Sequence, residues 1–388
     1  MADRIAEKIK RNWKNTDKGY LVLCILLSTL SVITLFSVGM YGGLTYGGVF
    51  GNMRPAYTQI VASLLGICAA VVISLIDYRR LMKLWPLHVA ICWGLVLLTF
   101  IPGIGYEPGQ TGSQSWIAMP FGMSFQPTEI AKISFYLTFA MHLNHAYKKL
   151  GKLRVLIPVL LHILAPVLLV HLQGDDGTAM VFLAIGVIML FVAGINRWVV
   201  ISITGAVLLA VPILWNFLMG NYQKERILGL FFPDKYADST MYQQLRARVA
   251  IGSGQWFGRG LFSDGQYYVP RSENDFIFSY YAEACGFIGA LILLGLLGAI
   301  LYKTLSVASN ASTRAGAYLC TGVFATLLFQ IVINVGMNLM LLPVVGLTLP
   351  FISAGGTSVL MLYISVGLVL SVSRHTRRDR GESKLCKA

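Results

Sequence analysis

The chain carries ionisable side chains inside or beside long apolar runs. A charge at membrane depth costs roughly 2.5–3.5 kcal/mol on insertion scales unless it is paired or lines a wet cavity. Glu129 and Lys132 lie three residues apart in the segment FQPTEIAKI. On a helix this spacing places both side chains on one face, within reach of an ion pair. Two interpretations stay open: a self-neutralising pair that only tolerates burial, or a pair that acts on a substrate.

A second acidic group, Asp175 and Asp176, lies between two apolar runs in the segment QGDDGT. Adjacent carboxylates could provide oxygen ligands for a divalent cation, or they could carry a proton. The alternative is a polar turn at the membrane surface, where one aspartate caps the next helix. The residues alone leave both interpretations open.

Asp275 ends a long polar stretch where an apolar run begins, and Glu283 follows inside that run. A helix would place the two carboxylates about two turns apart on a similar face. Carboxylates near a region of low dielectric hold their protons more tightly, which suits a general base. The alternative role for Asp275 is a helix N-cap, whereas Glu283, inside the run, has no such simple explanation.

The elements that must hold these groups are membrane-spanning helices. Of the 388 residues, 56% are apolar and only 12% are charged, against roughly 25% charged in ordinary soluble domains. This composition excludes a soluble cytosolic protein, a disordered chain and a secreted disulfide scaffold. A span needs about 20 apolar residues, and the sequence predicts an all-α polytopic membrane protein with about ten transmembrane helices. Their expected ranges are Tyr20–Met40, Tyr57–Ile76, Leu84–Ile101, Pro127–Met141, Val155–Leu172, Thr178–Gly194, Trp198–Phe217, Phe276–Tyr302, Ala315–Leu341 and Thr357–Ser373.

The distribution of basic residues predicts the orientation. With ten spans, both termini lie on the same side of the membrane. Most of the 31 Lys and Arg residues fall on that side, including those of the basic N-terminus 1–19 and the basic tail 374–388. Because cytoplasmic segments carry the excess of Lys and Arg, both termini are expected in the cytoplasm. The net charge of +14 is thus explained without a nucleic-acid partner.

Two segments on the opposite side are long enough to matter for function. Gly103–Phe125 is rich in Gly, Pro and Gln, and residues 218–275 are expected to form a large extracytoplasmic loop before the eighth span. Within that loop, Asp238–Ala250 is expected to be a short amphipathic helix, followed by the glycine-rich turn IGSGQWFGRG. Prolines and glycines interrupt Leu341–Ser358, and broken backbone at this depth must lie against protein or a water-filled cavity. We therefore expect a polar cavity in the outer half.

Five segments, in order, resemble the motifs of the SEDS family (shape, elongation, division and sporulation), which includes RodA and FtsW. They are FQPTEIAKI, QGDDGTA, YQQLRARVAIGSGQWFGRG, NDFIFSYYAEACGFIG and LLPVVGLTLPFISAGGTS. The resemblance runs from the first helix to the last as a single domain, residues 1–388, and ten helices is also the family's count. The short tail and the segments around Asp175 and Asp275 are most like the RodA type.

The resemblance implies a peptidoglycan glycosyltransferase of the bacterial cytoplasmic membrane. Such enzymes polymerise lipid II into glycan strands at the outer face, and the RodA type serves cell elongation and shape. Asp275 would be the essential carboxylate and the general base, and Glu129 and Lys132 would be catalytic residues of the fourth helix. The expected substrate-binding residues are Gln126, Asp175, Arg246, Arg248, Glu283 and Ser353.

The leaving pyrophosphate needs positive charge, which Lys132, Arg246, Arg248 or a divalent cation such as Mg or Mn could supply. No organic cofactor is expected. The expected partners are a class B penicillin-binding protein, lipid II and membrane lipid, without nucleic acid. One departure from the family pattern is Ser115 before Trp116, where an arginine is common, so the way in which the pyrophosphate is held stays open.

Two other functions are compatible with the same features. Buried charges and broken helices also suit a transporter or flippase that moves the lipid-linked precursor. A scaffold that only holds a partner enzyme is the third interpretation, and it predicts that Asp275 can be replaced freely. Polymer formation from lipid II by the purified protein separates the enzyme from both.

Overall fold

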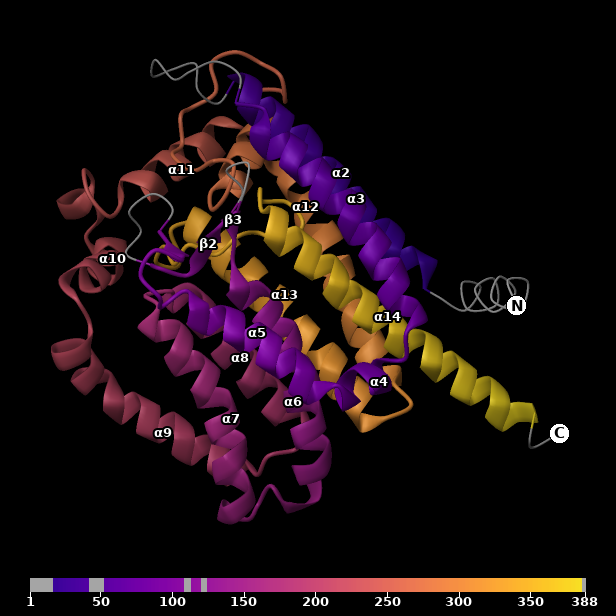
Figure 1. The fold of residues 1–388 in the computed structure, drawn as a ribbon. Helices are drawn as coiled ribbons and strands as arrows, with labels where there is room; N and C mark the ends of the chain where they lie inside the picture. Colours follow the sequence, from indigo (N-terminus) through magenta and orange to yellow (C-terminus); the bar gives the residue numbers. More distant parts are fainter. Residues whose placement is uncertain (1–16, 42–51, 108–112, 120–123, 386–388) are drawn as a thin grey trace.

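The computed structural model describes residues 17–41, 52–107, 113–119 and 124–385 (Figure 1). Each of the ten expected spans falls on a helix, so the prediction of a helical bundle holds. The ten helices are α2 (Lys18–Tyr41), α3 (Arg54–Leu75), α5 (Trp85–Leu98), α6 (Pro127–Ala146), α7 (Leu153–Leu172), α8 (Asp176–Val192), α9 (Arg197–Ile213), α12 (Ile277–Asn310), α13 (Arg314–Asn338) and α14 (Gly356–Leu385).

Six helices among the described residues are long and apolar enough to cross a membrane: α2, α3, α7, α12, α13 and the part of α14 over Gly356–Arg377. The helices α5 and α8 are shorter but also apolar. Helices suit the lipid bilayer because each helix makes its backbone hydrogen bonds within its own segment. Proline occupies the first turn of α3, α5 and α6, where its missing N–H costs nothing.

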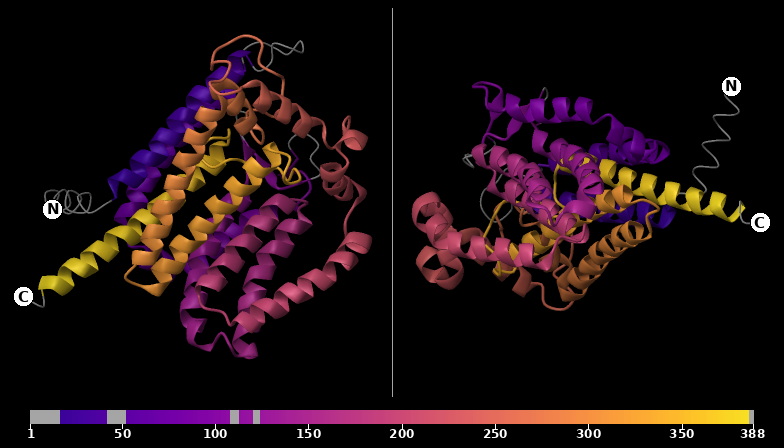
Figure 2. Two further views of the ribbon diagram at one scale, coloured as in Figure 1. Left: turned by 180° about the vertical axis from the view of Figure 1, so that it is seen from behind. Right: turned by 90° about the horizontal axis from the view of Figure 1, so that it is seen from below.

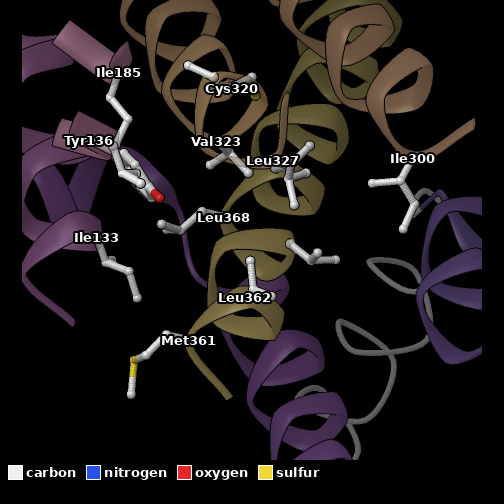
Figure 3. Close-up of a cluster of buried hydrophobic side chains, with 14 of the residues drawn as sticks. Ile133, Tyr136, Ile185, Ile300, Cys320, Val323, Leu327, Met361, Leu362 and Leu368 are labelled. Carbon is white, nitrogen blue, oxygen red and sulfur yellow. The ribbon is translucent and has the colours of Figure 1, made fainter. Parts of the chain in front are cut away.

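Helix α14 lies along α3 through the centre of the bundle, and α13 contacts α6, α8, α12 and α14 (Figure 1). Small residues permit close approach of membrane helices. A Cβ atom on Gly66 of α3 would lie 2.6 Å from the Tyr363 ring of α14. The apolar core between α6, α8, α13 and α14 includes Tyr136, Ile185 and Leu368 (Figure 3). Helix α9 lies at the periphery (Figure 2).

The face of the bundle that carries α10 (Asn221–Phe231) and α11 (Tyr242–Ser253) is called the outer face here. A small antiparallel sheet lies at the same end: β1 (Gly105–Tyr106), β2 (Trp116–Ala118) and β3 (Ser124–Phe125), in the order β1-β2-β3. The all-α expectation did not include this sheet, whose pairing satisfies backbone groups of the outer segment.

The amphipathic helix expected at Asp238–Ala250 is present as α11, which begins four residues later. The residues before it form turns after the 3₁₀ helix Pro233–Tyr236, where the Met241 amide donates to the Tyr236 carbonyl. Helix α10 was not predicted. Two further one-turn elements are η2 (Tyr147–Lys149) and η3 (Leu214–Leu218).

At the opposite face, ion pairs connect the residue before α2 with the ends of α12 and α14. Asp17 lies 3.4 Å from Lys303 Nζ and 3.9 Å from Arg377 Nη2. The Arg79 guanidinium, just inside α4 (Tyr78–Lys83), forms an ion pair of 2.9 Å with Asp379 on α14. These contacts place both described ends of the chain on one face, as an even number of spans requires.

Candidate active site

Asp275 lies immediately before α12 at the outer face, and it is 7% exposed. Its carboxylate oxygen Oδ2 lies 3.7 Å from Nη1 of Arg271. Burial raises the pKa of the Asp275 carboxyl, while the positive charges of Arg271 and Arg226 partly offset this shift and a third neighbour, Glu273, adds to it. A carboxyl with a raised pKa and a neighbouring cation can accept a proton at neutral pH.

Two asparagines of α13 hold the backbone of Asp275. The side-chain amides of Asn334 and Asn338 both donate to the Asp275 carbonyl, over 2.9 and 3.0 Å. The Asn338 oxygen also accepts a hydrogen bond of 3.1 Å from the Ser279 amide in the first turn of α12. The N-cap position of α12 is Phe276, which makes no side-chain cap. The alternative of Asp275 as N-cap is therefore wrong, because Asn338 fills that role from another helix.

Sequence reasoning missed Asn334 and Asn338. The available signal was two amides four residues apart in an apolar run, a spacing that places both on one helix face. Polar groups at that depth need partners, so they could have been marked as candidates. Their target, a carbonyl on a different segment, could not have been identified from the sequence.

The interrupted segment before α14 fastens the loop that carries Asp275. Ser353 is buried; its hydroxyl donates to the Asn274 carbonyl over 2.7 Å and accepts from the Leu349 amide over 2.8 Å. The Ala354 amide donates to the Glu273 carbonyl over 2.9 Å. Ser353 thus holds the chain next to Asp275. Its predicted contact with substrate is untested.

A second polar cluster joins α6 to α8. Lys132 Nζ and Glu129 Oε1 are 2.8 Å apart, and the two side chains are only 4% and 8% exposed. The Gln126 amide donates to Asp175 Oδ2 over 2.9 Å. Asp175 Oδ1 accepts from the Thr178 amide over 3.0 Å, so Asp175 is the N-cap of α8. The predicted ion pair and this N-cap are both present.

The adjacent Asp176 points elsewhere. Its Oδ1 lies 2.6 Å from His171 Nδ1, and its Oδ2 accepts from the Gln223 amide of α10. Within the described segments, no group of three or more His, Cys, Asp and Glu side chains could hold a metal ion. A hard cation bound here would have at most one or two carboxylates, with the rest of its ligands from water and substrate phosphates.

Glu283 lies in a different cluster from Asp275. It is 0% exposed, and its Oε1 accepts from the Tyr267 amide over 2.8 Å and from the Ser253 hydroxyl over 3.2 Å. Arg259 Nε lies 3.9 Å away. The Glu283 carboxylate is thus bonded to the last residue of α11 and to the backbone of Tyr267, and its contact with substrate stays a prediction.

That turn completes the hydrogen bonding of a break in α12. Gly286 has φ +71°, a conformation that suits glycine, and α12 is kinked there. Around the kink, the Arg259 amide donates to the Glu283 carbonyl over 2.9 Å, and the Gln255 carbonyl accepts from the Phe287 amide over 2.8 Å. The glycine-rich turn therefore supplies backbone hydrogen bonds to the break in α12.

Arginines lie around the outer ends of these helices. Arg246 donates to the Tyr268 carbonyl over 3.0 Å, and Arg248 is exposed on α11. Arg226 of α10 donates to the Val344 carbonyl over 2.6 Å. Ser115, the position at which the family resemblance would lead us to expect an arginine, is buried. Positive charge near Asp275 therefore comes from Arg271 and Arg226, neither of which was predicted.

The segment between α13 and α14 connects the Asp175 and Asp275 clusters. Gly177, two residues after Asp175, approaches so closely that a Cβ atom would lie 2.3 Å from the Val345 carbonyl. Leu347 lies two residues after Val345, and its carbonyl accepts a hydrogen bond of 2.8 Å from the Asn334 side chain. The two clusters thus share one supporting segment. The polar cavity between them stays a prediction.

Comparisons with known proteins agree with this architecture. A family described as "Cell cycle protein" (FtsW, RodA, SpoVE) matches residues 18–378. Peptidoglycan glycosyltransferase MrdB of Escherichia coli (strain K12) is 31% identical over 386 residues, which cover 97% of this chain and 98% of that protein. Stage V sporulation protein E of Bacillus subtilis (strain 168) is 29% identical over 362 residues, which cover 92% and 96%.

Solved structures show the same fold. The chain matches rod shape determining protein RodA of Thermus thermophilus with a TM-score of 0.65 and 27% identity, covering 94% of this chain and 98% of that one. It matches a chain of a peptidoglycan synthase complex, described as coordinating polymerization and crosslinking, with a TM-score of 0.75 and 28% identity, covering 93% and 98%. This chain is an integral membrane protein of the FtsW/RodA/SpoVE family.

Proposed function

We propose that this protein is a peptidoglycan glycosyltransferase that polymerises lipid II at the outer face of the bacterial cytoplasmic membrane. The observation that carries the proposal is the placement of Asp275. Its carboxylate stands at the outer end of the bundle, next to Arg271 and released from helix capping by Asn338. The name of the relative MrdB, a peptidoglycan glycosyltransferase, supports this reaction class.

In this reaction the 4-hydroxyl of one lipid-linked sugar attacks the anomeric carbon of another. The new bond joins that oxygen to the anomeric carbon, and the bond from the carbon to the pyrophosphate oxygen breaks. The hydroxyl proton passes to the carboxylate of Asp275, whose burial raises its pKa. The departing pyrophosphate carries negative charge, and its proposed stabilisers are Arg271 and Arg226, whose positive charges act on Asp275. Lipid tails reach the site from the side, since the helices stand in the bilayer.

The second cluster is proposed to hold the other substrate. Glu129 and Lys132 form a buried pair beside Gln126 and Asp175. A substrate phosphate could compete with Glu129 for the ammonium group of Lys132, because phosphate is a strong acceptor for cationic donors. Arg246 and Arg248 remain proposed substrate contacts. A divalent cation that accompanies the pyrophosphate also remains a proposal.

The orientation, the partner and the cellular role belong to the same proposal. Both termini are placed in the cytoplasm by the excess of basic residues on that side. A class B penicillin-binding protein is the proposed partner, because the matching synthase complex combines polymerization with crosslinking. A role in cell elongation is proposed from the likeness to rod shape determining protein RodA; relatives named FtsW and Stage V sporulation protein E match over similar lengths. Depletion that yields round cells would support this role, and filaments would point to division.

The test is polymerisation of labelled lipid II by the purified protein in detergent, with and without Mg²⁺ or Mn²⁺. Asp275→Asn is expected to fold and to lower the rate by about 10²–10⁴-fold, the usual contribution of a general base. Asp264→Asn is the matched control, since Asp264 is an exposed aspartate of the same outer segment. Equal rates for Asp275→Asn and the wild type would remove Asp275 from the role of base.

The flippase alternative is separated by the same assay. A flippase needs a sealed bilayer and forms no polymer in detergent. If the wild-type protein forms no polymer but moves lipid II across vesicle membranes, the enzymatic proposal is wrong. A scaffold would do neither, and it would tolerate Asp275→Asn in cells.

A further inference from the structure

Asn334 and Asn338 stand out because both are uncharged polar side chains that are 0% exposed in a membrane-spanning helix. Burying an amide is costly unless its hydrogen bonds are made. Asn334 donates to the carbonyls of Asp275 and Leu347, over 2.9 and 2.8 Å. Asn338 donates to the carbonyls of Asp275 and Asn334, over 3.0 and 2.8 Å. Each side-chain amide therefore uses both of its N–H groups.

The Asn338 oxygen completes the arrangement by capping α12. It accepts from the amide of Ser279, which is the third residue of that helix. A side chain at the N-cap position itself usually makes this bond. An aspartate close to the start of the helix would be well suited to make it. Because the Ser279 amide is bonded to Asn338 and also to the Phe276 carbonyl over 3.1 Å, this amide does not need the Asp275 carboxylate.

The paired donors also fix the peptide unit that follows Asp275. A carbonyl held by two buried amides can move little, and Asp275 has only two side-chain torsions between that backbone and its carboxylate. Displacement of a reacting group by about 1 Å can reduce a rate about 10²-fold. Position is therefore what these amides control.

We propose that Asn338, assisted by Asn334, is a positioning residue for the glycosyl transfer: it caps α12 in place of Asp275 and holds the Asp275 backbone, so that the carboxylate stays free and correctly placed to accept the proton. This inference rests on the proposed function, since it concerns the same carboxylate. Asn338 touches no reacting atom in this arrangement, and it acts through Asp275.

Three variants separate capping from holding. Asn338→Asp keeps an oxygen that can accept from Ser279 but loses the amide donors to the Asp275 carbonyl. Asn338→Ala loses both functions, and Asn334→Ala loses one donor without touching the cap. Asn310→Ala is the control, because Asn310 donates to a backbone carbonyl of α12 at the opposite face, far along the helix.

The experiment measures kcat and KM for lipid II polymerisation and the pH profile of kcat/KM, per mole of folded protein. Amide hydrogen exchange of the first turn of α12 is measured in the same samples. Asn338→Ala and Asn334→Ala are expected to lower kcat about 10²-fold with little change in KM. Asn338→Asp should keep the first turn of α12 protected, lower kcat, and move the acid limb to higher pH, because a second carboxylate disfavours ionisation of Asp275. The control should match the wild type.

Wild-type kcat and an unchanged pH profile in folded Asn334→Ala and Asn338→Asp would overturn the inference. If Asn338→Ala does not fold, those two variants, which retain the cap, decide the question. If the wild type itself makes no polymer, the proposed function fails and takes the inference with it. Exchange at Ser279 would still show whether Asn338 caps α12, so the two failures can be told apart.

Discussion

The buried ion pair of α6 permits a quantitative test of the structure. Lys132 Nζ lies 2.8 Å from Glu129 Oε1, with side chains 4% and 8% exposed. Lys132→Met would leave the Glu129 carboxylate buried without its cation and near the carboxylate of Asp175. Breaking a buried pair by removing one partner costs roughly 3–5 kcal/mol. This cost is a large part of the free energy of unfolding of native proteins, which is about 5–15 kcal/mol.

The double variant Glu129→Gln/Lys132→Met removes both charges and is expected to regain most of the lost stability, because replacing a whole buried pair is often neutral. Thermal unfolding in detergent, monitored by tryptophan fluorescence, gives the change in unfolding temperature for Lys132→Met and for the double variant. The drop for Lys132→Met should be on the order of 5–10 °C, from about 2 °C per kcal/mol in larger domains. High salt should leave the drop unchanged, since buried pairs are little screened.

Lys149→Met is the matched control, because Lys149 is exposed after α6 and surface substitutions usually stay within about 0.5 kcal/mol. If Lys132→Met unfolds at the wild-type temperature, the pair is not buried as described. If the double variant is no more stable than Lys132→Met, Glu129 and Lys132 do not act as a pair. A stable double variant that forms no polymer would support their proposed catalytic role.

The pH profile and the kink of α12 give two further tests. Because burial raises the pKa of Asp275, the acid limb of kcat/KM should lie above the usual range of an aspartate. Arg271→Gln should move this limb to still higher pH, since Arg271 favours the ionised form. An acid limb that does not move in this variant would contradict the assignment. Gly286→Ala should reduce the yield of folded protein, because its Cβ would lie 2.3 Å from the Gly258 amide nitrogen. Its backbone conformation, with φ +71° and ψ −172°, also costs other residues about 1–3 kcal/mol. Gly295→Ala is the control, because nothing lies within 4 Å of its Cβ, and its yield of folded protein in size exclusion should be unchanged. Equal yields for Gly286→Ala and Gly295→Ala would refute the close contact between Gly286 and Gly258.

Spans and pairs that depend on local spacing could be predicted from the sequence. Apolar runs indicate where the ten helices lie whatever their neighbours are, because lipid leaves the backbone no partner outside the helix, although only six of the described helices are both long and apolar enough to span a membrane. The pairing of Glu129 with Lys132 follows from helical periodicity alone. The N-cap at Asp175 was only one of two open interpretations, since Asp275 also precedes an apolar run but is not the N-cap of its helix.

What depended on contacts between distant segments was decided only by the tertiary structure. The cap of α12 comes from Asn338, far along the chain from Ser279, and no local pattern indicates such a partner. The periodicity of α12 placed Glu283 about two turns from Asp275 on a similar face, but it did not indicate the partners of Glu283, which are Ser253 at the end of α11 and the backbone of Tyr267. Periodicity shows which residues share a face of one helix. Which segment packs against that face is determined by the fold of the whole chain.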